Sequence, residues 1–425
     1  MTHEASLAYA LELDRNDPLK EFRQQFYLPQ VGGKDALYFL GNSLGLQPRS
    51  TQHEVLTIME NWANFGVEGF FLGSNPWLEY PKKLLPHLSK IVGAQENELV
   101  VMNHLTVNLH LLMISFYQPT ATRYKIICEA KAFPSDQYCM QSQIKLHGLN
   151  LADCLVEVSP RDGEETIRQE DILEAIEKHG HETALILFSG VNYYTGQVFN
   201  MQAITEAAHK VGAYAGFDLA HAAGNIALQL HDWQADFACW CNYKYLNSGP
   251  GAIAGAFIHE KHIGNPALQR LEGWWGNDAA NRFKMEEKFT PYLSAAAWQM
   301  STPPIMLLAA HYASLQIFGE AGFEKMLTKS ALLSDYLLFL LNEINTTTET
   351  FTIITPQEPG EHGCQVSFSV KENARALFDQ LLPNGIFADW REPNVIRVAP
   401  VPLYNSFQDI FLFSETLKKL LNGPV

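Results

Sequence analysis

Three apolar runs between positions 183 and 241 restrict the possible folds of this chain more than any other feature. They are Thr183–Ser189, Tyr214–Asp218 and Ala235–Cys241. A short, continuously apolar run is typical of a strand that is covered on both faces. Between the first two runs, Ala203–Val211 has a helical pattern that ends at Gly212. This alternation predicts an α/β fold with a doubly wound, mostly parallel sheet.

A different pattern begins near residue 302. Pro303 and Pro304 open a helical region that we expect to continue through Ile344, and short strand candidates follow at Gln365–Val370 and Val395–Ala399. These features predict a smaller α+β domain. We therefore predict three parts: an N-terminal segment (1–50) that packs with the small domain, a large cofactor-binding domain (51–305) and a small C-terminal domain (306–425).

Composition excludes some classes of partner. The formal net charge is −16 and no basic patch is present, so we expect no binding of nucleic acid. The apolar segment Tyr336–Leu341 is too short for a membrane span and is flanked by Asp335 and Glu343. The N-terminus lacks a secretory pattern. The six cysteines are scattered, and we predict reduced, partly buried thiols, no metal site, a cytoplasmic location and a small-molecule substrate.

Asp218 and Lys244 are the strongest candidates for catalysis. Asp218 closes one predicted strand, and Lys244 follows another, 26 residues later. In a parallel sheet, ligands bind at the carboxyl ends of the strands. A pyridoxal-phosphate enzyme needs a lysine for a Schiff base and a carboxylate that keeps the pyridine nitrogen protonated. A surface lysine and a helix-capping aspartate are the alternative, which the neighbouring residues disfavour.

Three neighbours strengthen this interpretation. Ser189 falls at another strand end of the same predicted edge. His221 follows Asp218 by three residues and can lie against the cofactor ring, although a structural histidine is an alternative. Tyr243 directly precedes Lys244, where it is a candidate donor to the phosphate or to a reaction intermediate. A core aromatic residue is the competing interpretation for Tyr243.

Two further segments are candidates for the cofactor site. We interpret Thr106 as the N-cap of an apolar helix whose free N–H groups suit a phosphate, with ordinary capping as the alternative. Phe133–Asp136 follows the predicted strand Tyr124–Cys128 as a loop. In that loop, Phe133 is placed to stack on a pyridine ring, unless it serves only in packing. Ser135 and Asp136 are candidates to reach the cofactor.

Arg397 is a candidate for binding a substrate carboxylate. It lies between apolar residues in Val395–Pro400. An arginine in such a strand is seldom buried without a partner. A bidentate contact with a substrate carboxylate is one solution, and a structural ion pair is equally consistent with the sequence.

Several long motifs together resemble the kynureninase family. They cover nearly the whole chain in the expected order: Phe39–Pro48, Leu105–His110, Gly216–Gly224, His231–Trp233, Phe237–Asn247 and Ile396–Ser406. The resemblance implies a fold-type-I pyridoxal-phosphate enzyme that works as a homodimer with shared active sites. Members hydrolyse L-kynurenine, and in some cases 3-hydroxy-L-kynurenine, to anthranilate or 3-hydroxyanthranilate and L-alanine. The implied roles are tryptophan catabolism and NAD biosynthesis.

The resemblance also assigns roles to residues. Lys244, Tyr243 and Asp218 would be catalytic, with Lys244 the Schiff-base lysine. Arg397 would bind the substrate carboxylate, with Phe70, Ser43 and Ser301 nearby. The residues that would contact the cofactor are Leu105, Thr106, Phe133, Pro134, Ser135, Asp136, Ser189, Asp218, His221, Tyr243 and Lys244, with Trp274 and Thr302 from the second subunit.

The chain departs from the family pattern at two positions, and the sequence also allows one alternative function. Animal members have histidine where this chain has Phe70, and asparagine where it has Thr302, so both positions bear on the preferred substrate. The alternative function is that of another fold-type-I enzyme, such as a cysteine desulfurase or an aminotransferase. A desulfurase needs a mobile cysteine in the C-terminal region, where Cys364 is the only candidate, and its surroundings are typical of a strand.

Overall fold

The computed structural model describes residues 3–423. Its main sheet has seven strands in the order β4-β10-β9-β8-β7-β5-β6. β10 is antiparallel to β4 and β9, and the remaining pairings are parallel. The predicted mostly parallel sheet is thereby confirmed. The strands are β4 Leu99–Val101, β5 Lys125–Glu129, β6 Leu155–Val158, β7 Thr183–Ser189, β8 Tyr214–Asp218, β9 Phe237–Cys241 and β10 Ala254–Ile258.

Helices cover both faces of this sheet, which explains why its strands are continuously apolar. Along β7, Ile186 and Phe188 enter one core, and Leu185 and Leu187 enter the other, because successive side chains point to opposite faces. The helices of the two faces are α3 Leu85–Val92, α7 Gln169–His179 and α8 Met201–Lys210 on the first, and α4 Leu105–Phe116, α5 Pro134–Leu146 and the short α6 Leu151–Cys154 on the second.

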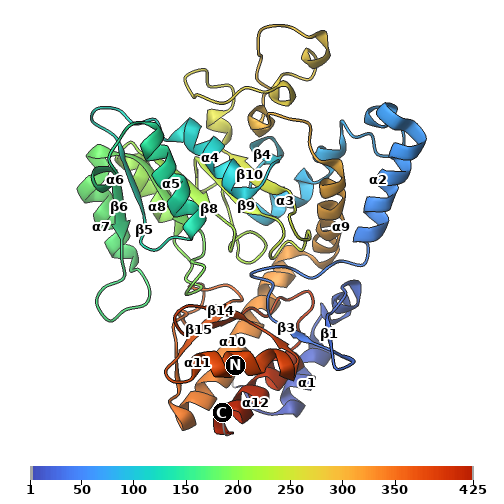
Figure 1. The fold of residues 1–425 in the computed structure, drawn as a ribbon, viewed down its shortest axis with the longest axis vertical. Coiled ribbons are helices and arrows are strands. Elements are labelled where there is room, and N and C mark those ends of the chain that lie inside the picture. Colours follow the sequence, from blue (N-terminus) through green and yellow to red (C-terminus); the bar gives the residue numbers. More distant parts are fainter. Residues whose placement is uncertain (1–2, 424–425) are drawn as a thin grey trace.

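A second, antiparallel sheet has the strand order β11-β12-β15-β14. It shares a core with α10, α11 and α12, in the lower half of Figure 1. The strands are β11 Phe351–Ile353, β12 Val366–Val370, β14 Asp389–Arg391 and β15 Val395–Val398, and the helices are α10 Phe323–Thr348, α11 Ala374–Leu381 and α12 Phe407–Asn422. This is the smaller α+β unit expected from the sequence.

The N-terminal segment lies against this smaller unit. Helix α1 (Leu7–Asn16) packs on α12, and Phe39 is buried in the same core. Strand β3 (Leu37–Tyr38) pairs in parallel with β13 (Ile386–Phe387), and β1 (Gln30–Val31) forms a hairpin with β2 (Lys34–Asp35). The domain boundaries at residues 50 and 305 stay a prediction.

The helical region predicted after Pro304 is divided into two helices. Two helices are present, α9 (Ile305–Ala321) and α10, with a break at Gly322. Gly322 has φ +81°, which a right-handed helix cannot contain and which glycine adopts without steric cost. Helix α9 packs on α2 (Thr51–Phe65), and the two stand side by side in Figure 1. The break therefore lets α9 join the upper part of the molecule while α10 enters the lower.

Within residues 3–423, no helix combines the length and apolar character needed to cross a bilayer. All six cysteines lie in this part of the chain, and each is a buried free thiol.

Candidate active site

The carboxyl edge of the main sheet brings the central candidates together. Asp218 ends β8, Ser189 ends β7, and Lys244 follows β9. They line one pocket, and ten of the residues proposed from the sequence are among those that line it. The lining residues are Leu105, Thr106, Glu129, Phe133, Ser135, Asp136, Ser189, Val191, Tyr193, Asp218, Ala220, His221, Cys241, Tyr243 and Lys244.

Lys244 points into this pocket without a carboxylate partner. Its Nζ lies 3.0 Å from Nε2 of His221, and it forms no ion pair within residues 3–423. Burial, reinforced by the charge of Lys244, lowers the pKa of His221 well below its ordinary value. The imidazole is therefore neutral and can accept a hydrogen bond from the lysine. The Nζ atom also lies 5.9 Å from the ring centre of Phe133 and 6.0 Å from that of Tyr243.

Two buried aspartates face each other in the pocket. Burial raises the pKa of Asp136 well above its ordinary value, and the charge of Asp218 raises it further. Burial also raises the pKa of Asp218, but a backbone N–H from Ala220 at 2.7 Å and the charge of Lys244 oppose this rise. The pKa of Asp136 is therefore raised more strongly than that of Asp218. A cationic group in the pocket would stabilise a negative charge on Asp218.

Two helix N-termini contribute residues to the lining of the pocket. The N-cap of α4 is His104, so Thr106 is the second helical residue and not the N-cap that the sequence suggested. Among residues 3–423 no side chain caps this terminus, so its first N–H groups are available to an anion. The predicted Phe133–Asp136 loop is also corrected, because Pro134 begins α5 and Phe133 is its N-cap. Proline favours the first helical position, since it lacks an N–H that would be unsatisfied there.

These features fit pyridoxal phosphate. The first turn of α4 suits the phosphate, and the exposed ring of Phe133 (41% accessible) suits stacking on the pyridine. In the part of the chain that the structure describes, Oδ1 of Asp136 and Nδ1 of His221 are buried and have no hydrogen-bond partner. Buried polar atoms without partners are rare in native proteins, and a bound cofactor would give these two atoms a partner.

Arg397 is fully buried on β15 and is already paired. Its guanidinium contacts the carboxylate of Asp389 and donates to the carbonyl of Tyr193. Burial lowers the pKa of Arg397 to about 10. The structural ion pair that the sequence left open is therefore present. Arg397 does not itself line the pocket, but it contacts Tyr193, which does. Its role in binding a substrate carboxylate stays a prediction.

The remaining sequence candidates do not line the pocket. Ser301 and Thr302 are exposed and precede α9, and Trp274 is 45% accessible, with its ring N–H donated to the Arg282 carbonyl at 2.9 Å. Phe70 packs edge-on against Trp77 with ring centres 5.1 Å apart. The other two are Pro134, which starts α5, and Ser43, which lies two residues before a glycine that bonds to the Tyr243 carbonyl.

The sequence interpretation missed two pocket residues that organise it. Glu129 is the last residue of β5, one position beyond the end predicted at Cys128. The rule that ligands meet the carboxyl ends of parallel strands would have found it, had the strand been extended by one residue. Tyr193 lies in a loop after β7, and no local pattern marks it.

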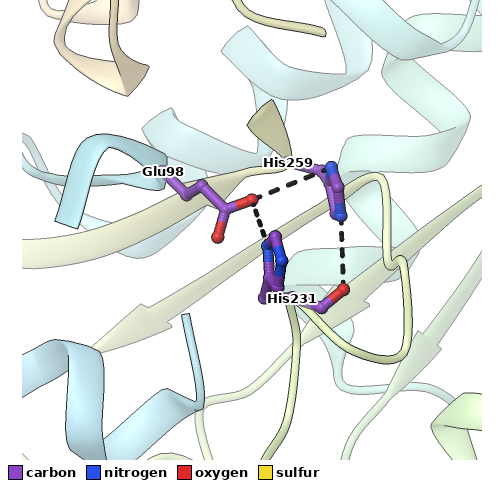
Figure 2. Close-up of side chains that lie close together, drawn as sticks. All are labelled: Glu98, His231 and His259. Carbon is purple, nitrogen blue, oxygen red and sulfur yellow. Dashed lines mark hydrogen bonds and ion pairs between the residues drawn. The ribbon is translucent and has the colours of Figure 1, made fainter. Parts of the chain in front are cut away.

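A polar cluster outside the pocket of Lys244 involves the His231-Asp-Trp motif. Glu98 is fully buried and accepts from Nδ1 of His231 at 2.9 Å, with Nδ1 of His259 at 3.7 Å (Figure 2). The two imidazoles are stacked at 5.1 Å with planes 10° apart, so their in-plane lone pairs do not converge on one point. Glu98 also accepts the backbone N–H groups of Gln95 and Glu260. The cluster therefore joins β4, the loop around His231 and the residues after β10.

Comparisons with known proteins agree on one family. The profile of the kynureninase C-terminal domain matches residues 326–417. A kynureninase of Flavobacterium psychrophilum is 54% identical over 99% of both chains, and one of Flavobacterium johnsoniae is 51% identical over 100% of both. A kynureninase of Homo sapiens is 46% identical over 99% of this chain and 94% of its own length.

Solved structures show the same fold at low identity. The cystine C–S lyase C-DES superposes with a TM-score of 0.75 at 17% identity, covering 93% of this chain and 100% of its own. A cysteine desulfurase of Thermococcus onnurineus gives 0.73 at 18%, covering 92% and 95%. This is the fold-type-I architecture expected from the sequence. Cys364 is 1% accessible, and burial raises its thiol pKa to about 12, so it does not resemble a mobile desulfurase nucleophile. From sequence identity over its full length, the chain belongs to the kynureninase family.

Proposed function

We propose that this protein hydrolyses L-kynurenine to anthranilate and L-alanine, with pyridoxal phosphate held on Lys244. The observation that carries the proposal is the Lys244 amine beside neutral His221, in the same pocket as the buried Asp136–Asp218 pair. Relatives named kynureninase, 46–54% identical over nearly the whole chain, support the choice of substrate.

When bound, pyridoxal phosphate supplies an electron sink that stabilises negative charge developing on the substrate carbons. The residues of the chain support this chemistry from several sides. The Asp218 carboxylate would accept the hydrogen bond of a protonated ring nitrogen, and the first turn of α4 would hold the phosphate. The Lys244 amine would remove the proton from the substrate α-carbon.

The net reaction consumes one water molecule. Its hydroxyl adds to the γ-carbonyl carbon, the bond between Cβ and Cγ breaks, and anthranilate leaves with the new carboxylate. A proton, equivalent to the one that the water molecule releases, then adds to Cβ, and Lys244 would return the proton that it took from the α-carbon, which gives alanine. Tyr243 is the candidate donor, because burial raises the pKa of its phenol and keeps it protonated. Arg397 is proposed to bind the α-carboxylate of the substrate.

The partners and the location are also proposals. Exposed apolar side chains on α2 and in residues 271–293 support a homodimer with shared sites, in which Trp274 and Thr302 approach the cofactor of the second subunit, near Phe70, Ser43 and Ser301. Those side chains are Leu56, Met59, Trp62, Phe65, Leu271, Trp274, Phe283, Met285 and Leu293. Free buried cysteines support a cytoplasmic location, and tryptophan catabolism, with or without NAD biosynthesis, is the proposed role.

The direct test is anthranilate fluorescence after L-kynurenine is added to the purified protein loaded with pyridoxal phosphate. We expect a steady increase that depends on the cofactor, with an equal amount of L-alanine released. Absence of both products, from a protein that retains the cofactor, would contradict the proposal. Release of sulfur from L-cysteine under the same conditions would favour the desulfurase alternative.

A further inference from the structure

Glu129 is a buried carboxylate in the pocket that the proposed reaction does not use. It ends β5, is 2% accessible and lines the pocket beside Asp218. Within residues 3–423 it has no ion-pair partner and is held by neutral donors instead. Its Oε1 accepts the Ser189 backbone N–H at 3.0 Å, and its Oε2 accepts Nδ2 of Asn192 at 2.8 Å. The two donors are the last residue of β7 and a residue three positions later.

The orientation of the Asn192 amide is fixed by other contacts. Its Oδ1 accepts the backbone N–H groups of Tyr194 and Thr195, both at 3.0 Å, and the Thr195 hydroxyl at 3.2 Å. Turning the amide over would break all three hydrogen bonds, so Nδ2 must face Glu129. A side chain at position 129 therefore needs two acceptors. A glutamine offers only one, and its amide group would oppose either the Asn192 amide or the Ser189 N–H.

The segment 189–193 also contacts Arg397, the arginine proposed to bind the substrate carboxylate. The Tyr193 carbonyl accepts from Arg397, and from Nε2 of Gln365 at 3.1 Å. The Tyr193 ring meets Phe133 edge-on, with ring centres 5.2 Å apart and planes at 82°. Ser189 and Asn192 are therefore held by Glu129, and the next residue, Tyr193, is held by Arg397 of the smaller sheet.

We propose that Glu129 is a positioning residue that fixes the segment 189–193, so that the Tyr193 carbonyl holds Arg397 in place for a ligand carboxylate. It acts through Asn192, Tyr193 and Arg397, and it does not touch the substrate. The proposal rests on the proposed function only in taking the ligand to be an amino acid.

The test compares Glu129→Gln and Asn192→Ala with a control, Glu157→Gln. Glu157 lies on the neighbouring strand β6, where its exposed carboxylate accepts from Gln137 at 2.9 Å. For the two test variants we expect the KM for L-kynurenine to rise about ten-fold, the size expected from one unsatisfied buried donor, with a much smaller change in kcat. The double variant should lose little more than either single variant, because both break the same contact.

Ligand binding separates positioning from a general loss of structure. The shift in visible cofactor absorbance reports binding of L-alanine and of ethylamine, which lacks the carboxylate. Glu129→Gln should weaken L-alanine binding about ten-fold and leave ethylamine binding close to that of the wild type, since only the carboxylate contact is disturbed. Equal weakening of both ligands would overturn the proposal, as would unchanged binding of both.

One measurement needs neither cofactor nor substrate. Hydrogen exchange in residues 189–197 of the cofactor-free protein should accelerate in Glu129→Gln and not in Glu157→Gln. Unchanged exchange would also overturn the proposal. If Glu129→Gln does not fold, the KM, ligand binding and hydrogen exchange are measured in Asn192→Ala instead. A wild type that binds L-alanine through this network but does not turn over L-kynurenine would contradict the proposed reaction and leave the role of Glu129 intact.

Discussion

The side-chain nitrogen of Lys244 lies 3.0 Å from Nε2 of His221, at the carboxyl edge of the main sheet. Because burial and the lysine charge lower the pKa of His221 well below its ordinary value, the imidazole is neutral and serves as an acceptor. The lysine therefore has a defined direction in the pocket without an ion pair that would have to be broken before it reacts.

Replacing Lys244 with alanine should remove covalent attachment of the cofactor and nearly all turnover. The physical reason is that no other lysine lines the pocket in the described part of the chain. Borohydride reduction followed by mass spectrometry measures the attachment, with Lys371→Ala, an exposed position, as the control. A cofactor adduct that persists at the same site in Lys244→Ala would show that the assignment is wrong.

Replacing Arg397 with glutamine should raise the KM for L-kynurenine while the cofactor is retained. A charge-assisted hydrogen bond to a carboxylate contributes about 1.5–3 kcal/mol. Asp389→Asn is the control, since Asp389 pairs with Arg397 and would keep a contact with Arg391 at 3.2 Å. If both variants lose the same stability and neither changes the KM, the arginine is purely structural.

We predict that Phe70, which packs against Trp77, influences the choice between L-kynurenine and its 3-hydroxy analogue. We expect the wild type to prefer L-kynurenine, because a phenyl ring cannot hydrogen-bond the added hydroxyl and an unpaired buried hydroxyl costs about 1–3 kcal/mol. Phe70→His should shift the ratio of kcat/KM toward the hydroxylated substrate, and Phe70→Leu should not. Ser43, Ser301 or Thr302 are other candidate partners for this hydroxyl. A wild-type preference for 3-hydroxykynurenine would refute the argument.

His311 should make folding stability depend on pH. It is fully buried with Nδ1 2.6 Å from the Ser248 hydroxyl, and burial lowers its pKa to about 3. In the unfolded chain its pKa is near 6.5, so below that pH the unfolded state binds the extra proton. The contribution of His311 to the free energy of unfolding is complete above pH 6.5, and it falls by about 1.4 kcal/mol per pH unit as the pH drops toward 3.

Denaturant unfolding at pH 7.5, 6 and 5 measures this effect. His311→Gln should be less stable than the wild type at pH 7.5, and the difference should shrink as the pH falls. His53→Gln, at an exposed histidine, should run parallel to the wild type. Parallel behaviour of His311→Gln as well would show that His311 is not the group responsible.

Glu98 should contribute to stability without a metal ion. Glu98→Gln places a donor where backbone N–H groups of Gln95 and Glu260 and the ring of His231 now donate, which should cost about 1–3 kcal/mol. Thermal unfolding measures the loss, with exposed Glu96→Gln as the control. A rise in the melting temperature of the wild type on adding Zn²⁺, absent from His231→Ala, would instead indicate a metal site.

The sequence was sufficient for the four central strands of the main sheet, β9, β8, β7 and β5, and for the centre of the site. The apolar runs predicted both ends of β7 and β8 correctly. A strand that is covered on both faces is continuously apolar, so its own residues are enough to identify it. Asp218, Ser189 and Lys244 then followed from the rule that parallel strands present their carboxyl ends at one edge. The motifs around these three residues indicated the kynureninase family.

The tertiary structure decided which distant groups meet. Glu129 reaches the backbone of Ser189, 60 residues away, and Arg397 reaches the Tyr193 carbonyl, 204 residues away. Whether Arg397 is paired with Asp389, and whether the Asp136 oxygen is left without a partner, depends on the packing of two sheets and not on any local pattern. A hydrogen bond requires atoms within about 3 Å, and only the folded chain brings residues so far apart in sequence to that distance.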